Sequence, residues 1–217
     1  MDRKLVLASA LLIVIMGIVP NMVLADISVG VKKGDWIEYQ VTYTGTPPPR
    51  HDATWARMEI ADVQGKIISL NMVTKFSNGT QIFETSALNL ETGQLGDDFI
   101  IPANLVKGDT FYDKNLGNVT ISGVEEISVA GATRTVVSAT TYQTTFYWDQ
   151  ATGVTVEASS NFTNYNYTLA SKADKTNMWQ PQILGLNPTL FYALATMAAV
   201  ILVVVALLAF FVIRRKK

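Results

Sequence analysis

The 217-residue sequence contains no cysteine and a single histidine, His51. The chain therefore has no disulfide framework and no thiolate nucleophile, and it offers almost no ligands for zinc. His51 lies in a proline-rich loop, residues 47–52. A Ser-His-Asp arrangement through Asp52 is formally possible, but no nucleophile-elbow glycine pattern accompanies it. We expect a solvated loop here, and no catalytic residue, metal site or cofactor in the chain.

The spacing of the carboxylates does not favour catalysis. The pairs 97–98 and 125–126 could serve glycoside hydrolysis only if two carboxyls faced one another across a cleft. Neighbours on a strand point to opposite faces, so residues 125–126 are unsuited to this role. Residues 113–117 have the spacing of calcium ligands, but the twelfth position is Val124 and not glutamate. We favour ordinary turns, and a carboxylate-dependent surface hydrolase remains only an alternative.

Charge is absent from one long stretch near the C-terminus. Residues 190–213 form an uncharged run of 24 residues. As a helix this run would be about 36 Å long, enough to cross a hydrocarbon core of about 30 Å. Asn187 and Pro188 suit the N-cap and first helical position. We predict a transmembrane helix over 188–213, in contact with the lipid bilayer through 190–213.

Basic residues at the two ends indicate the topology. Residues 1–25 have Arg3 and Lys4, an apolar run and a small residue, Ala25, at a plausible cleavage point. This pattern is typical of a signal peptide, although a retained membrane helix remains the alternative. The four cations at 214–217 predict a cytoplasmic tail. The expected layout is thus a single-pass protein in the cell membrane, with 26–178 as a β-rich extracellular domain and 179–187 as a juxtamembrane linker.

The exported part is acidic. It holds 17 acidic and 11 basic side chains, a net charge of −6. Nucleic-acid binding depends on neutralising phosphates, so this class of partner is not expected. Four glycan acceptor sequences support export and predict possible glycosylation. Their asparagines are Asn78, Asn118, Asn161 and Asn166.

Apolar residues alternate with polar ones through most of residues 27–180. Ile37, Tyr39, Val41 and Tyr43, for example, alternate with polar residues. Such a period of two is typical of half-buried strands, and no amphipathic helix is apparent. The sequence predicts a mainly β fold, an antiparallel sandwich or partly closed half-barrel of about ten strands, plus the C-terminal transmembrane helix.

Aromatic residues are numerous for a domain of this size. Tyr147 must point away from Trp148 if the two share a strand. Either the sheet is covered on both faces or one face carries an aromatic patch that binds lipid, glycan or protein. Trp36, Trp55, Tyr147 and Trp148 are the candidate ligand-binding residues.

Three segments of the sequence resemble segments of known protein families. GDWIEY at 34–39, YWDQATGVTVE at 147–157 and TNMW at 176–179 resemble landmarks of uncharacterised archaeal surface proteins. Those proteins also have a signal peptide, a β-rich ectodomain and one C-terminal span, and no established activity. More distantly, 147–157 is similar to a strand–turn–strand unit of bacterial lipoprotein-carrier half-barrels. In that family a curved sheet covered by helices holds acyl chains, whereas this sequence lacks clear lid helices.

These features favour a non-enzymatic, membrane-anchored surface protein that binds or scaffolds a membrane or envelope protein partner. The alternative from a different class is a membrane-tethered carrier or sensor of a hydrophobic ligand, such as a lipid or lipoprotein. An internal apolar cavity of several hundred Å³ would favour this alternative.

Overall fold

The structure is a computed structural model that describes residues 27–48, 51–96, 99–163 and 166–215, without the side chains of 209, 211–213 and 215. The predicted signal peptide, 1–25, and the carboxylate pair at 97–98 lie outside the described residues. The described chain is mainly β, with eleven strands and one long C-terminal helix.

Nine strands form one antiparallel sheet in the order β4-β3-β2-β1-β11-β10-β9-β8-β7, and β5 and β6 form a separate hairpin. The strands are β1 Trp36–Gly45, β2 Ala53–Gln64, β3 Ile67–Phe76, β4 Gln81–Asn89, β5 Thr110–Asp113, β6 Gly117–Thr120, β7 Gly123–Val129, β8 Ala132–Thr141, β9 Thr144–Asp149, β10 Thr155–Phe162 and β11 Tyr167–Thr176. Within the described residues β4 and β7 are the two edges, so the sheet does not close into a barrel. The predicted mainly β fold with a C-terminal helix is confirmed.

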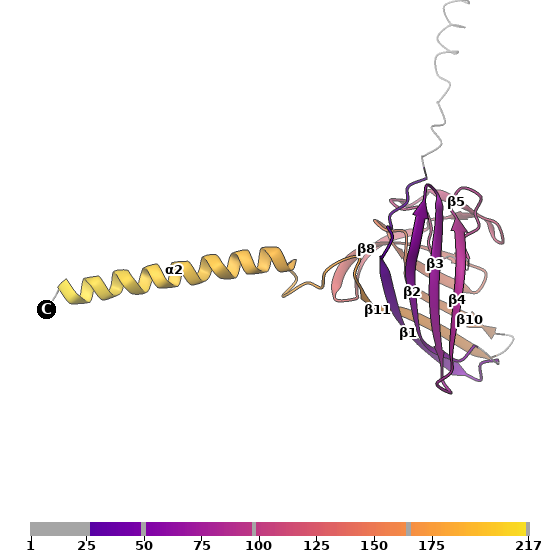
Figure 1. The fold of residues 1–217 in the computed structure, drawn as a ribbon, viewed down its shortest axis with the longest axis horizontal. Helices are drawn as coiled ribbons and strands as arrows, with labels where there is room; N and C mark the ends of the chain where they lie inside the picture. The colour runs from indigo at the N-terminus through magenta and orange to yellow at the C-terminus, as the bar shows by residue number, and fades with distance from the viewer. Residues whose placement is uncertain (1–26, 49–50, 97–98, 164–165, 216–217) are drawn as a thin grey trace, which may run out of the picture.

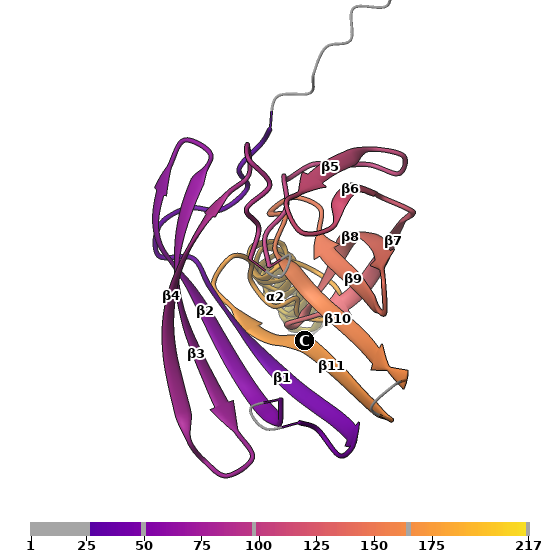
Figure 2. The same cartoon turned by 90° about the vertical axis from the view of Figure 1, so that its right-hand side faces the viewer.

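The sheet is strongly curved. β1 to β4 form one wall and β7 to β11 the other, so that the two walls enclose a concave face (Figure 2). The walls are joined where β1 pairs with β11, which places Ile37 opposite Thr176 although 139 positions separate them. This pairing of the first and last strands makes one continuous sheet from two sets of sequential hairpins.

The concave face is filled at one end. Alternation along β1 buries Ile37 and Tyr39 there, as the sequence pattern predicts. The β5–β6 hairpin covers this end (Figure 2). There Phe111 meets the fully buried Trp148 at 5.8 Å between ring centres, with the two rings nearly perpendicular. The residues that the structure describes provide no such cover at the other end of the concave face, and the groove described below lies there.

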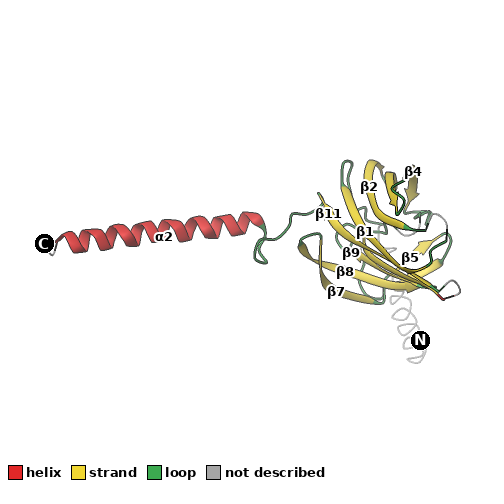
Figure 3. Cartoon of the chain, turned by 90° about the horizontal axis from the view of Figure 1, so that it is seen from below, coloured by secondary structure: helices red, strands yellow, loops and turns green. Residues whose placement is uncertain are grey.

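The helix α2, Pro188–Arg215, extends away from the domain (Figures 1 and 3). Asn187 is its N-cap, because its side-chain oxygen accepts a hydrogen bond from the Leu190 amide at 2.8 Å. Residues 188–208 are long and apolar enough to cross a membrane, and none of that stretch is buried against the domain.

Tyr39 provides a pH-dependent test of the packed core. Its hydroxyl donates to the carbonyl of Thr155 at 2.8 Å, and burial raises the pKa of the phenol above its ordinary value. The unfolded chain therefore releases this proton near pH 10 while the folded chain keeps it, so stability falls above pH 10. The loss from this group is up to about 1.4 kcal/mol per pH unit. Urea unfolding between pH 8 and 11 is expected to show a shallower decline for Tyr39→Phe; equal slopes would contradict the assignment.

Candidate functional site

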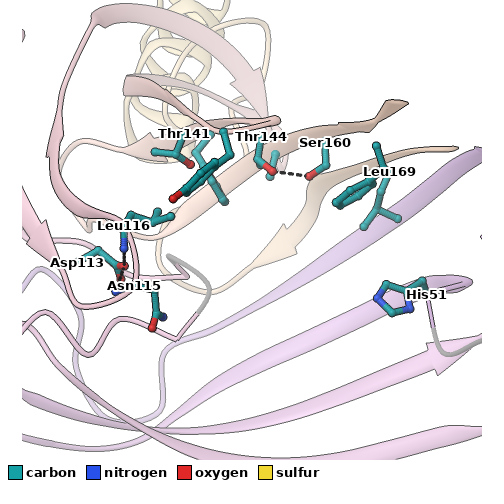
Figure 4. Close-up of a pocket in the computed structure, with 12 residues that line it drawn as sticks. His51, Asp113, Asn115, Leu116, Thr141, Thr144, Ser160 and Leu169 are labelled. Atoms are coloured by element: carbon teal, nitrogen blue, oxygen red, sulfur yellow. Dashed lines mark hydrogen bonds between the residues drawn. The ribbon is translucent and has the colours of Figure 1, made fainter. Parts of the chain in front are cut away.

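A groove of about 500 Å³ occupies the uncovered end of the concave face (Figure 4). Its floor comes from alternate residues of β8 to β11, and its sides from the β5–β6 turn and the β1–β2 connection. The lining residues are His51, Asp113, Asn115, Leu116, Thr141, Tyr142, Thr144, Phe146, Ala158, Ser160, Phe162 and Leu169. The volume lies in the range of small-molecule sites, roughly 300–1,000 Å³.

The floor of the groove combines apolar side chains with neutral hydroxyls. Phe146, Phe162 and Leu169 supply apolar surface, and Thr144 and Ser160 share a hydrogen bond at 2.8 Å between their hydroxyl oxygens. No lysine or arginine is among the described residues that line it. Such a surface suits an uncharged, largely apolar ligand with a few hydrogen-bonding groups.

Asp113 is the only carboxylate among the described lining residues, and its hydrogen bonds stabilise a turn of the fold. Its Oδ1 accepts hydrogen bonds from the amides of Asn115 and Leu116, both at 2.7 Å, and the residue is buried. This is a capped turn, and it orders the loop that places Leu116 in the groove. A hydrolase with two carboxyls converging on this groove is therefore not supported by the residues described.

A stacked aromatic pair lies beside the groove. The rings of Phe162 and Tyr167 lie 5.3 Å apart, and the Tyr167 hydroxyl donates to the backbone carbonyl of His51 at 2.9 Å. Partial burial, followed by the nearby Asp52 charge, raises the pKa of Tyr167. Asp52 accepts a hydrogen bond from the Ser77 hydroxyl, which lowers the pKa of this exposed carboxyl. His51 and Asp52 are thus held beside the groove.

Tyr142 stands at the rim of the groove in a strained conformation. It occupies the β8–β9 turn with φ of 49° and is 89% exposed. A bulky residue in this left-handed region costs about 1 kcal/mol or more. Tyr142 also borders a second hollow of about 360 Å³ that shares Leu116 and Thr141 with the groove. A strained, exposed aromatic at the junction of two hollows is well placed to contact a ligand.

The structure does not bring together the four aromatic residues singled out from the sequence. Trp36, Trp55 and Tyr147 are partly buried on the convex face, on β1, β2 and β9 respectively. Trp148 is fully buried and stacks on Phe146 at 5.2 Å between ring centres. Tyr147 does point away from Trp148, as the alternation along the strand requires.

The four glycan acceptor asparagines, Asn78, Asn118, Asn161 and Asn166, are all exposed. Asn161 lies on the convex face of β10, because Phe162 and Ser160 line the groove on the other face. Glycosylation of these residues remains a prediction.

Sequence reasoning missed the groove residues as a group. Alternation along β9 to β11 does predict which residues share a face. It does not indicate that the β5–β6 hairpin covers only one end of that face. The local pattern contains no signal that distinguishes Phe146 and Phe162, which line the groove, from the buried Phe111.

No protein-family model matches the chain, and no curated protein matches it. Among solved structures, MucB in complex with MucA(peri) is 12% identical with a TM-score of 0.38; the match covers 69% of this chain and 51% of MucB, about half its length. A candidate exported protein with a YmcC-like fold from Bacteroides fragilis is 7% identical (TM-score 0.39, covering 70% of this chain and 99% of that one). A candidate lipoprotein from Parabacteroides distasonis is 9% identical (TM-score 0.41, covering 70% and 100%).

The half-barrel and archaeal likenesses noted from the sequence both remain resemblances, because each of these TM-scores is below 0.5. Such low similarity does not carry over a ligand or a partner.

Proposed function

We propose that this chain is a membrane-anchored, non-enzymatic binding protein whose concave groove takes the apolar chain of a neutral lipid or lipid-modified molecule. In this proposal residues 1–25 direct export, 26–178 form the extracellular domain, 188–213 span the membrane and 214–217 face the cytoplasm.

The observation that carries the proposal is the half-filled concave face. A sheet of nine strands has enough inward-facing residues for a continuous core, yet the described residues leave about 500 Å³ uncovered beside Phe146 and Phe162. An open apolar groove costs stability because its walls stay in water. Burial of a ligand chain recovers this free energy, and the hydroxyls of Thr144 and Ser160 can hold an ester or hydroxyl group.

The groove predicts an affinity that depends on chain length. Each methylene transferred from water contributes about 0.8 kcal/mol, so monoacylglycerols of increasing length should bind about fourfold more tightly per carbon until the groove is full. Binding can be measured with the solubilised chain against the free aqueous concentration of monoacylglycerol, through the change in tryptophan fluorescence. Trp148, which stacks on the groove residue Phe146, contributes to this signal. An affinity that does not change with chain length would overturn the proposal.

Two neighbouring serines on β10 provide a matched pair of variants. Ser160 lines the groove, whereas the exposed Ser159 lies on the convex face of the same strand. Ser160→Trp should fill the groove and lower monoacylglycerol affinity at least tenfold, while Ser159→Trp should leave it unchanged. Thermal unfolding of both variants controls for misfolding. Equal affinity for the two variants would place the ligand outside the groove.

A further inference from the structure

Residues 176–182, the docked segment, lead from the end of β11 towards α2. Asn177 joins β11 to the start of β1: its Oδ1 accepts from the Trp36 amide at 2.8 Å and its Nδ2 donates to the Gly34 carbonyl at 2.9 Å. Further along, the Gln182 amide donates to the Gly131 carbonyl at 2.7 Å, and the Gln182 side chain accepts from the Thr133 amide at 3.2 Å. Both ends of the segment are therefore bonded to the sheet.

Trp179 anchors the middle of the docked segment. It is only 9% exposed, and the Arg134 guanidinium lies over its ring at 4.8 Å. Arg134 in turn pairs with the buried Asp149 through two contacts of 2.7 and 3.2 Å. The Trp179 ring thus covers a charge pair that belongs to β8 and β9. Its indole N–H has no acceptor among the described residues, so the contact depends on stacking and burial.

The four residues that follow form a closed juxtamembrane turn, residues 183–186. Ile183 and Leu186 exchange both backbone hydrogen bonds, at 2.8 and 3.1 Å. Leu184 and Gly185 have φ of 53° and 78°, as in a type I′ turn. The next residue, Asn187, already caps α2. From Gln182 to the helix, the chain is accordingly fixed by hydrogen bonds.

Leu184 at the apex of this turn is not packed against the described domain. It is 88% exposed, and a branched side chain with positive φ is costly. Asparagine or glycine would serve the turn better. The turn lies beside the first residues of α2 (Figures 1 and 3), next to an apolar stretch that needs lipid around it. An exposed leucine at this level is stabilised if the surroundings are the interfacial layer of a bilayer.

We propose that the docked segment and juxtamembrane turn hold the domain in one fixed orientation directly on the bilayer, with Leu184 inserted into the lipid interface. The partner of this surface is the lipid surface around α2. This inference rests on the proposed function only in that α2 spans a membrane. It makes the domain a rigid extension of its helix. β8 carries Thr133 and Arg134, which contact the docked segment, and at its far end the groove residue Thr141.

The absence of cysteine allows a direct test, because single cysteines can be labelled without background. The full chain is reconstituted in phosphatidylcholine nanodiscs with a fluorophore at Leu184→Cys, Val106→Cys or Ala199→Cys, and with quenchers at the headgroup or along the acyl chain. β5 lies on the side of the domain away from α2 (Figures 1 and 3), and Val106, which is 50% exposed, lies four residues before the start of β5. Headgroup-level quenching at 184 should exceed that at 106 several-fold. If the acyl-chain quencher acts at 199 and no quencher acts at 184, the helix spans the membrane but Leu184 does not contact lipid, which would overturn this inference alone. If no quencher acts at 199, the helix does not span the membrane, which would overturn the membrane anchor as well.

Gly131 provides the test of rigidity. It has φ of 76°, and a Cβ added there would lie 2.8 Å from the Cβ of Pro181 in the docked segment. Gly65 also has positive φ, 59°, but an added Cβ would meet nothing within 4 Å. Gly131→Ala and Gly65→Ala therefore share the backbone strain, and only the first disturbs the docking. Gly131→Ala should increase the rotational mobility of a label at 106 in nanodiscs and reduce quenching at 184, with Gly65→Ala unchanged. Equal mobility in the two variants would mean that the docked segment does not hold the domain.

Discussion

Replacement of Arg134 by Met is expected to lower the free energy of unfolding by about 3–5 kcal/mol, because the variant leaves a buried carboxylate without its cation. The Asp149 side chain is 1% exposed. Its Oδ1 also accepts hydrogen bonds from the amide and hydroxyl of Thr152, but these neutral donors do not replace a guanidinium. Urea unfolding of the full chain in detergent, followed by circular dichroism, measures the loss.

Arg57 is a matched control for this prediction. Like Arg134 it lies over a tryptophan, Trp36 at 4.3 Å, and pairs with a carboxylate, Glu38 at 2.9 Å. The Glu38 side chain is 17% exposed, and a second partner, Glu59, is 49% exposed, so water can solvate both when the arginine is removed. Arg57→Met should therefore cost about 1 kcal/mol or less. Similar losses for the two variants would show that burial of the carboxylate is not the deciding factor.

Arg134→Lys separates charge from geometry at the same site. Lysine keeps the charge but has neither the planar fork that contacts both oxygens of Asp149 nor the flat face that stacks on Trp179. An intermediate loss of stability is expected, together with increased exposure of Trp179 to an aqueous quencher. If Arg134→Lys unfolded with the same free energy as the unchanged chain, the positive charge of Arg134 alone would account for its contribution to stability.

Much of the fold could be predicted from local pattern. The period of two identified the strands around Ile37 and Tyr39, and the uncharged run and its Asn187 cap identified α2, because each signal lies within a few neighbouring residues. The order of the strands in the sheet cannot be predicted from such local patterns. The pairing of β1 with β11 is set by contacts between residues such as Tyr39 and Ala173, and no local pattern specifies it.

The groove and the docked segment were beyond prediction for the same reason. Phe146 lines a groove and Trp148, two residues along, is core, although both lie on one face of β9. What separates them is the position of the β5–β6 hairpin, which lies some thirty residues earlier in the chain. Residues 179–187 have the composition of a linker. The contacts of Trp179 and Gln182 depend on Arg134 and Gly131, which are far away in sequence.

Trp148→Ala is the second change for which a large effect is expected. Trp148 is fully buried; its ring is nearly perpendicular to that of Phe111 and stacked on that of Phe146. Truncation of such a residue leaves a cavity that the strands cannot close, at a cost of about 3–5 kcal/mol. Because Phe146 then loses the ring on which it stacks, it can turn into the cavity, and the groove loses part of its apolar wall. Chains that remain folded should therefore bind monoacylglycerols more weakly.

Two further variants separate the loss of stability from the loss of binding. Trp55→Ala removes a partly buried tryptophan from the convex face and should cost about 1 kcal/mol, with binding unchanged. Trp148→Phe keeps an aromatic ring beside Phe146 and should retain most of the affinity at a smaller loss of stability than Trp148→Ala. Both Trp148→Ala and Trp148→Phe lack the tryptophan nearest the groove residue Phe146, so their binding is measured by calorimetry. If Trp148→Ala were no less stable than Trp55→Ala, the covered end of the concave face would not be the main core. The groove would then lack a rigid wall on the side of Trp148. The distinction between a packed end and an open end of the concave face would no longer hold.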